Sequence, residues 1–167
     1  MAARSNAPID PARELTIKRV FDAPRELVFK AWTDPAQVAK WWGPHGFTVV
    51  SCKMDLRVAG AWRLCMRSPK GIEDRQVGAF REIVERERLV FTYAFEDEAG
   101  KPGHQSIVTV TFADLDGKTA MTLHQAVFQS VAVRDDHVRG WGEALDHLAE
   151  YVAQAHRNQR NPKEIGR

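Results

Sequence analysis

The chain has 167 residues, of which 44% are hydrophobic and 28% are charged, and its formal net charge is +2. This composition predicts one globular domain with a core of its own. Basic and acidic residues alternate, as in segment 81–89 (REIVERERL), so we expect no nucleic-acid partner, which would need clustered basic charge. No apolar run approaches the roughly 20 residues of a membrane span, and residues 1–14 lack the apolar region of a signal peptide. We therefore expect a cytoplasmic protein without a membrane contact.

The first elements alternate between strand and helix signals. Segment 15–21 (LTIKRVF) alternates between apolar and polar residues, which predicts a strand. Pro24 suits the first turn of a short helix, and Asp34 suits the N-cap of a second one. Gly43 and Pro44 should end that second helix, because glycine adopts the left-handed C′ conformation and proline cannot continue a helix.

From residue 47 onward the hydrophobic pattern has a period of two, which predicts strands joined by short turns. Such connections are too short for parallel crossovers, so the strands should pair antiparallel. From Ser130, a suitable N-cap, to His156 the period becomes helical. The predicted strands are 47–55, 60–67, 74–84, 88–96, 105–114 and 118–128, and the predicted apolar stripe of the helix is Val138, Trp141, Leu145, Leu148 and Val152.

This order of elements predicts an α+β fold in which a curved antiparallel sheet of about seven strands wraps around a long C-terminal helix. Two short helices should lie between strands 1 and 2. We expect one domain over residues 14–156, with flexible tails at 1–13 and 157–167. A curved sheet and a straight helix can leave a pocket between them.

Five segments occur in the order and spacing of a known family: 21–44 (FDAPRELVFKAWTDPAQVAKWWGP), 55–60 (DLRVAG), 77–93 (VGAFREIVERERLVFTY, with its Gly78–Phe80 pair), 116–128 (DGKTAMTLHQAVF) and 139–152 (RGWGEALDHLAEYV). Over about residues 14–153 the chain resembles the AHSA-like proteins, homologues of the activator of the 90-kDa heat-shock protein ATPase. These belong to the START/SRPBCC helix-grip superfamily, which includes the birch-pollen-allergen fold. The resemblance implies a hydrophobic ligand cavity between the sheet and the long helix.

The chain departs from the family pattern at two places. The family usually has Asp-x-Arg-x-Gly-Gly at a strand corner, whereas here Ala59 precedes Gly60, so the turn must tolerate a Cβ atom. His124 lies one place before the position where the family often has histidine, and Gln125 occupies that position. A role attributed to the family histidine therefore does not transfer to this chain.

No catalytic, metal-binding or cofactor-binding residue is predicted. The six histidines have no metal-ligand spacing, and Cys52 and Cys65 predict buried free thiols rather than a disulfide. No nucleotide loop or nucleophile elbow occurs in the sequence. Glu143, His147 and Glu150 look like a proton-transfer group, but their helical positions predict that they face solvent.

Strand alternation places aromatic and methionine side chains on the inner face of the sheet, together with Val50, Cys52 and Met54. Aromatic residues and methionines commonly line adaptable apolar pockets. Trp41, Trp42 and His45, from the segment KWWGPHGF (40–47), should form the cavity rim. The predicted cavity residues are Trp62, Leu64, Met66, Phe80, Phe91, Tyr93, Phe95, Val110, Phe112, Met121, Leu123, Gln125, Trp141, Leu145 and Leu148.

These observations favour a non-catalytic protein that binds a small apolar or amphipathic ligand, in stress or metabolite handling. Fatty acids, sterols and aromatic polyketides are the ligands to test. Two alternatives stay open: a cavity enzyme such as a cyclase or hydrolase, and a protein-interaction module that forms a homodimer or contacts a chaperone. The enzyme would need a buried histidine or carboxylate that projects into the pocket.

Overall fold

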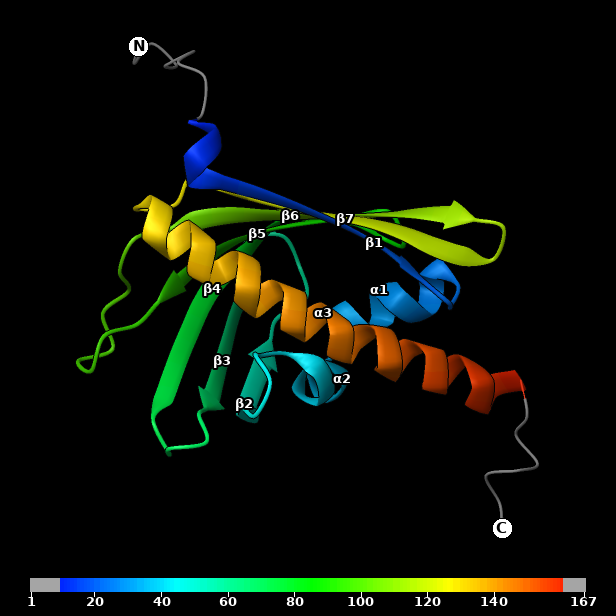
Figure 1. The fold of residues 1–167 in the computed structure, drawn as a ribbon, viewed down its shortest axis with the longest axis horizontal. Helices are drawn as coiled ribbons and strands as arrows, with labels where there is room; N and C mark the ends of the chain where they lie inside the picture. Colours follow the sequence, from blue (N-terminus) through cyan, green and yellow to red (C-terminus); the bar gives the residue numbers. More distant parts are fainter. Residues whose placement is uncertain (1–9, 161–167) are drawn as a thin grey trace.

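A seven-stranded antiparallel sheet curves around one long helix, as Figure 1 shows. The computed structural model describes residues 10–160. The strand order is β1-β7-β6-β5-β4-β3-β2, and α1 and α2 lie in the connection between β1 and β2. The elements are η1 (Pro11–Arg13), β1 (Glu14–Phe21), α1 (Arg25–Thr33), α2 (Pro35–Trp41), β2 (Thr48–Met54), β3 (Ala61–Arg67), β4 (Glu73–Val84), β5 (Arg88–Phe95), β6 (Ser106–Leu115), β7 (Lys118–Ala126) and α3 (Val131–Arg160).

The predicted α+β fold and its order of elements are confirmed. The Asp34 side chain accepts a hydrogen bond from the backbone N–H of Ala36 (3.0 Å) and caps α2. At the other end of the chain, the Ser130 hydroxyl accepts from the N–H of Val133 (3.2 Å) and caps α3. This helix continues to Arg160, past the predicted end at residue 156. Residues 1–9 and 161–167 of the two predicted tails lie outside the described residues.

A bulge in β2 makes one prediction of the inner face wrong. Strict alternation placed Val50 against the core, but the pairing of β2 with β3 shifts between Val49 and Ser51. The extra residue reverses the alternation at this point. Val49 packs against the core instead, and Val50 is 41% exposed.

The corner between β2 and β3 accommodates the alanine that departs from the family pattern. Ala59 adopts a left-handed conformation with φ of +68°, which costs a non-glycine residue roughly 1–2 kcal/mol. Position 60 must remain glycine, because a Cβ atom there would lie 2.0 Å from the carbonyl oxygen of Asp55. Arg57 Nε donates to Asp55 Oδ2 (2.7 Å) on the exposed side of the turn, as expected for a structural corner.

The five tryptophans of the chain form one connected cluster in the core. Ring centroids of Trp32 lie 4.7 Å from Trp41, 6.1 Å from Trp42 and 5.8 Å from Trp141. Trp62 joins the cluster through Trp42, at 6.1 Å. These side chains connect α1, α2, β3 and α3, so the region between sheet and helix is largely aromatic.

Trp62 reaches across β4 because its register partner there is Gly78. The indole Nε1 donates to the carbonyl oxygen of Thr92 on β5 (3.0 Å). A Cβ atom on Gly78 would lie 1.8 Å from that same oxygen and 2.3 Å from the indole nitrogen. The absence of a side chain at this position therefore allows the indole to bridge three strands.

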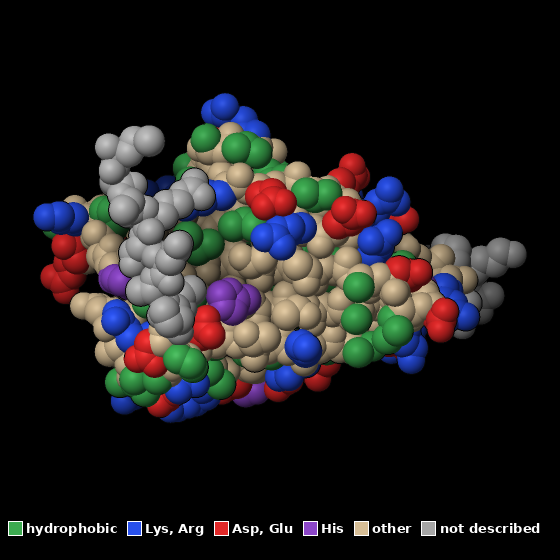
Figure 2. Space-filling model, turned by 90° about the horizontal axis from the view of Figure 1, so that it is seen from above, with side chains coloured by type: hydrophobic (Ala, Val, Ile, Leu, Met, Phe, Trp, Pro, Cys, Tyr) green, Lys and Arg blue, Asp and Glu red, His purple; other side chains and the backbone are tan. Residues whose placement is uncertain are grey.

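The outer surface mixes charges of both signs. Figure 2 shows the molecule from above: Lys and Arg alternate with Asp and Glu, and the hydrophobic side chains form separate small groups. Cys52 is half-buried and Cys65 is buried, and both are free thiols as predicted. Burial raises the pKa of the Cys52 thiol to about 11.

Candidate functional site

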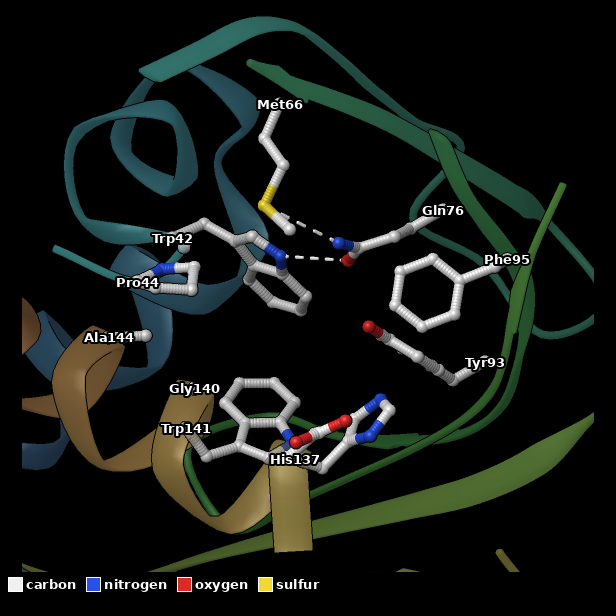
Figure 3. Close-up of a pocket in the computed structure, with 12 residues that line it drawn as sticks. Trp42, Pro44, Met66, Gln76, Tyr93, Phe95, His137, Gly140, Trp141 and Ala144 are labelled. Atoms are coloured by element: carbon white, nitrogen blue, oxygen red, sulfur yellow. Dashed lines mark hydrogen bonds between the residues drawn. The ribbon is translucent and has the colours of Figure 1, made fainter. Parts of the chain in front are cut away.

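A pocket of about 140 Å³ lies between the inner face of the sheet and the first half of α3. Figure 3 shows its walls: the loop after α2 and helix α3 on one side, and strands of the sheet on the other. Most of the lining is aromatic or aliphatic. The lining residues are Trp42, Gly43, Pro44, Met66, Gln76, Tyr93, Phe95, Asp136, His137, Gly140, Trp141 and Ala144.

The predicted cavity set divides into three groups in the structure. Met66, Tyr93, Phe95 and Trp141 line the pocket, and Phe95 is 39% exposed near its opening. A second group borders a separate void of only about 10 Å³, and the third group is packed in the core. The second group is Trp62, Leu64, Phe80 and Phe91, and the third is Val110, Phe112, Met121, Leu123, Gln125, Leu145 and Leu148.

Two buried glutamines hold the indoles that face the pocket. Trp42 Nε1 donates to Gln76 Oε1 (2.9 Å), and Gln76 Nε2 contacts the Met66 sulfur at 3.5 Å. Trp141 Nε1 donates in the same way to Gln125 Oε1 (2.8 Å). Because buried N–H groups need partners, these pairs fix the orientation of both rings. The sequence pattern gave no reason to select Gln76.

The structure decides which tryptophan of the adjacent pair faces the pocket. Trp42 lines it, whereas Trp41 packs beneath α1 and donates from Nε1 to the carbonyl oxygen of Ala31 (2.9 Å). Both side chains are buried, and their ring centroids are 5.4 Å apart. Pro44, two residues after Trp42, continues the pocket wall.

The loop after α2 is fastened to α3 by His45. The backbone N–H of His45 donates to Glu143 Oε1 (3.0 Å), and the imidazole Nδ1 lies 2.8 Å from His147 Nε2. Glu143 and His147 lie at the surface, as predicted, but this loop covers them in part, so that both are half-buried, whereas Glu150 is exposed. A helical wheel misses this contact because the loop folds back over the polar face of the helix.

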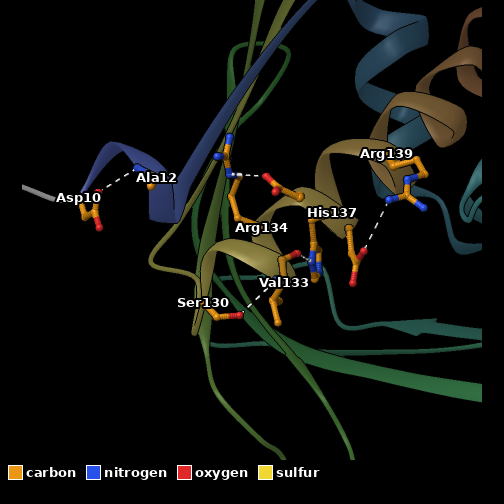
Figure 4. A network of polar contacts seen from close by, with 9 residues as sticks. Asp10, Ala12, Ser130, Val133, Arg134, His137 and Arg139 are labelled. Atoms are coloured by element: carbon orange, nitrogen blue, oxygen red, sulfur yellow. Dashed lines mark hydrogen bonds and ion pairs between the residues drawn. The ribbon is translucent and has the colours of Figure 1, made fainter.

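His137 is another pocket residue that was not predicted from the sequence. Its Nδ1 donates to the carbonyl oxygen of Val133 (2.9 Å), as Figure 4 shows. Its Nε2 is buried and has no hydrogen-bond partner among the described residues. The ring contacts three aromatic residues, with centroids 5.5 Å from Tyr93, 5.7 Å from Phe95 and 4.9 Å from Phe128.

A helical signal for His137 was present in the sequence. It lies four residues before Trp141, so the two side chains share one face of α3. The predicted stripe used Val138 instead, which is 39% exposed, so this part of the stripe is wrong. Val138 and His137 both have helical spacing from Trp141, and the prediction chose the apolar residue of the two.

Burial controls the protonation of the two polar rings in the pocket. Burial lowers the pKa of His137 below its ordinary value, although the Val133 carbonyl and Asp136 oppose this shift. A neutral imidazole that donates from Nδ1 carries a lone pair on Nε2. Burial, aided by Asp74, raises the pKa of the Tyr93 phenol, which therefore keeps its proton. The pocket wall thus contains a neutral imidazole, whose Nε2 is covered by neighbouring atoms, and one phenol group that keeps its proton.

The lowered pKa of His137 makes a prediction about stability. As pH falls below 6.5, the ordinary value, the unfolded chain binds a proton at His137 more readily than the folded chain does. This residue therefore destabilises the fold increasingly in acid, and its contribution vanishes at higher pH. His137→Phe should flatten the fall in the free energy of unfolding between about pH 7 and pH 5. Urea unfolding at several pH values measures the free energy of unfolding of both proteins. If this free energy falls equally steeply with pH in His137→Phe and in the unaltered chain, the prediction is wrong.

Residues 10–160 contain no helix that is long and apolar enough to cross a membrane. In the same part of the chain, no group of three or more histidine, cysteine, aspartate and glutamate side chains is arranged to hold a metal ion.

A curved antiparallel sheet that grips one long helix, with a pocket between them, defines the helix-grip class of proteins. A family model described as "Activator of Hsp90 ATPase homolog 1-like protein" matches residues 22–153. The chain therefore belongs to this family, as the resemblance of its motifs predicted.

Solved structures agree with this assignment. Protein CV1439 from Chromobacterium violaceum is 33% identical, with 84% of this chain and 96% of that chain covered and a TM-score of 0.73. A protein from Arthrobacter aurescens is 26% identical, with 86% and 87% covered and a TM-score of 0.78. The AHSA1 protein (SPO3351) from Silicibacter pomeroyi is 25% identical, with 86% and 99% covered and a TM-score of 0.77. None of the curated proteins compared with the chain matches it.

Proposed function

We propose that this protein binds a small amphipathic molecule in the pocket between its sheet and α3. The observation that carries this proposal is the aromatic pocket itself, where Trp42 and Trp141 are held by buried glutamines. A wall fixed in this way is preorganised, so binding loses little side-chain entropy. Contact with a chaperone or a second copy of the chain stays a prediction from the sequence alone.

Toluene should bind in the pocket and shift the NMR signals of particular indole N–H groups. Trp42 and Trp141 line the pocket, so their Nε1–H signals should move on titration. The Nε1–H of Trp41 donates to Ala31 away from the pocket and should stay in place, which gives an internal control. If toluene at saturation in water shifts neither pocket signal, the proposed function fails.

A variant that fills the pocket provides the matched test. Ala144 is 3% exposed and lines the pocket, so Ala144→Leu should place additional carbon atoms in the space and abolish the toluene shifts. Ala132→Leu makes the same change at an exposed position on α3 and should leave the shifts intact. Retained shifts in Ala144→Leu would place the toluene elsewhere.

One observation favours a second candidate function, a cavity enzyme. His137 lines the pocket, and a neutral imidazole is the kind of group that such an enzyme needs as a proton acceptor, although neighbouring atoms cover its Nε2, so the ring must turn before it can accept a proton. Its neutral form predominates because burial lowers the pKa. Turnover of a candidate substrate that falls on acidification and disappears in His137→Phe would support this function over binding alone.

A further inference from the structure

A second chamber lies beside the pocket, toward the N-terminal end of α3. Its volume is about 170 Å³, and it is lined by residues of α3, of β5 and β6 and of the loops next to them. The pocket, which is the first chamber, and this second chamber share three lining residues, Tyr93, Phe95 and His137. The two chambers are therefore neighbours that a single layer of side chains separates.

The layer between the two chambers consists of three rings in mutual contact. The ring centroids of Tyr93 and Phe95 lie 5.5 Å apart, and the centroid of His137 lies 5.5 Å from Tyr93 and 5.7 Å from Phe95. Figure 3 shows the three side chains, with Tyr93 between the other two. Tyr93 and Phe95 belong to β5, whereas His137 belongs to α3. A turn of the His137 ring alone would therefore open a passage between sheet and helix.

The imidazole of His137 is held by one hydrogen bond. Its Nδ1 donates to the carbonyl oxygen of Val133 (2.9 Å), whereas Nε2 is buried and has no partner among residues 10–160. The free energy lost by burying an unpaired polar atom is comparable to what one hydrogen bond contributes. The residue as a whole is only half-buried, so solvent is close to the ring. The observed ring position thus carries a cost that turning the ring removes.

Joined, the two chambers have the size and shape of a site for an elongated ligand. Pockets for drug-sized ligands span roughly 300–1,000 Å³, a range that neither chamber reaches alone and that both reach together. On α3, Ala144 is the last residue that lines the first chamber, and Val133 is the first that lines the second. The helical rise between these two residues is about 16 Å.

The polarity of the walls changes from the first chamber to the second. The indole N–H groups of Trp42 and Trp141 are already paired with buried glutamines, so the first chamber offers a ligand mainly apolar contact. The second chamber extends to His104 and Gln129, which are both exposed. An imidazole and an amide each form hydrogen bonds with a hydroxyl. This change suits a molecule with an apolar ring at one end and a neutral polar group at the other.

Extending the proposed function, on which this step rests, we propose that the two chambers bind one elongated ligand of the arylalkyl alcohol type, and that the His137 ring turns aside to admit its chain. The aromatic ring of the ligand lies against Trp42 and Trp141, and the hydroxyl lies near His104 and Gln129. His137 is then the gate that distinguishes ligands by length, because a ligand confined to the first chamber leaves the ring in place.

Benzyl alcohol and 4-phenyl-1-butanol, which differ by three methylene groups, test this gate when titrated against the full chain by NMR. Both should shift the indole signals of Trp42 and Trp141, which line the first chamber. Only the longer alcohol should shift the methyl signals of Val133 and the ring signals of His104, which line the second chamber alone. Each buried methylene strengthens binding about fourfold, so the longer alcohol should bind at least about tenfold tighter despite the turn of the ring.

Variants of α3 separate the second chamber from a general preference for apolar ligands. Val133→Phe fills the second chamber, so the preference for 4-phenyl-1-butanol should fall below about threefold while benzyl alcohol binding stays within about twofold. Ala132→Phe adds the same side chain at a neighbouring exposed position and should retain the preference. His137→Ala removes the gate and should increase the preference about threefold or more, because no ring has to turn.

The titrations of the unaltered chain do not depend on the folding of any variant. If saturating 4-phenyl-1-butanol leaves the Val133 and His104 signals in place, or if both alcohols bind equally well, the chambers do not join and the proposed gate is wrong. A preference for the longer alcohol that persists in Val133→Phe would contradict the gate as well. If neither alcohol nor toluene shifts the indole signals of Trp42 and Trp141, the proposed function fails instead.

Discussion

Gly78→Ala should reduce the free energy of unfolding by about 3–5 kcal/mol, a value at the upper end for single substitutions. The new Cβ atom would lie 1.8 Å from the carbonyl oxygen of Thr92, which is backbone and cannot rotate away. To make room, β4 and β5 must separate, and the hydrogen bond from Trp62 Nε1 to Thr92 must break. Overpacking and a lost buried hydrogen bond thus add together.

Urea or thermal unfolding followed by tryptophan fluorescence measures this loss. Gly142→Ala is the matched control, because the nearest atom to a Cβ there is Arg19 Nη2 at 3.9 Å and the position is helical. That control should gain about 0.5–1 kcal/mol from the helical preference of alanine over glycine. If the Gly78→Ala protein is as stable as the unaltered chain, β4 and β5 can separate without a loss of free energy of unfolding, and the prediction is wrong.

Gln125→Leu should cost about 2–4 kcal/mol, although leucine is apolar and has nearly the same size. Gln125 is 0% exposed, accepts from Trp141 Nε1 (2.8 Å) and donates to the Ser106 hydroxyl (2.8 Å). The substitution leaves the buried N–H of Trp141 without a partner, and it leaves the Ser106 hydroxyl with only its long contact to the Tyr93 carbonyl oxygen (3.5 Å). An unpaired buried group costs about 1–3 kcal/mol.

A double-mutant cycle with Trp141→Phe isolates the indole–glutamine pair. In the double variant neither the indole N–H nor the amide remains, so its loss of stability should be smaller than the sum of the two single losses by about 1 kcal/mol or more. Strictly additive losses would contradict the view that Gln125 acts by holding Trp141. The indole N–H signal of Trp141 in Gln125→Leu should also move, because its acceptor is gone.

Local pattern was sufficient for most of the fold. The alternation in segments such as 105–114, the caps at Asp34 and Ser130, and the stop at Gly43 and Pro44 are all local signals, and the structure confirms each element that they predict. Antiparallel pairing followed because the turns are short. The bulge after Val49 was not predicted, because one unpaired residue does not visibly change the alternation of apolar and polar residues along the strand.

Which inward-facing residues line the pocket depends on contacts between segments that are distant in the sequence. Met66, Tyr93, Phe95 and Trp141 were identified from alternation and helical spacing, and all four line it. The same rules could not distinguish them from Leu123 or Leu148, which are packed in the core, because an inner-facing residue becomes lining only where the opposite side chains leave space. Gln76 and His137 were missed because polar residues do not contribute to a hydrophobic period.

The sequence by itself determined the family, through the resemblance of its motifs, and the order of strands and helices, which follows from periodicity, caps and turn chemistry within a few residues. It also indicated the inward face of most elements, with Val50 and Val138 as the exceptions. Only the tertiary structure decided that Trp42 rather than Trp41 faces the pocket and that His45 attaches its loop to Glu143 and His147. It also decided that the imidazole of His137 lies in an apolar wall, where Nε2 has no hydrogen-bond partner among residues 10–160. The physical reason is that burial and hydrogen-bond pairing are properties of neighbours in space, and the residues that supply them here are up to about a hundred positions apart in the chain.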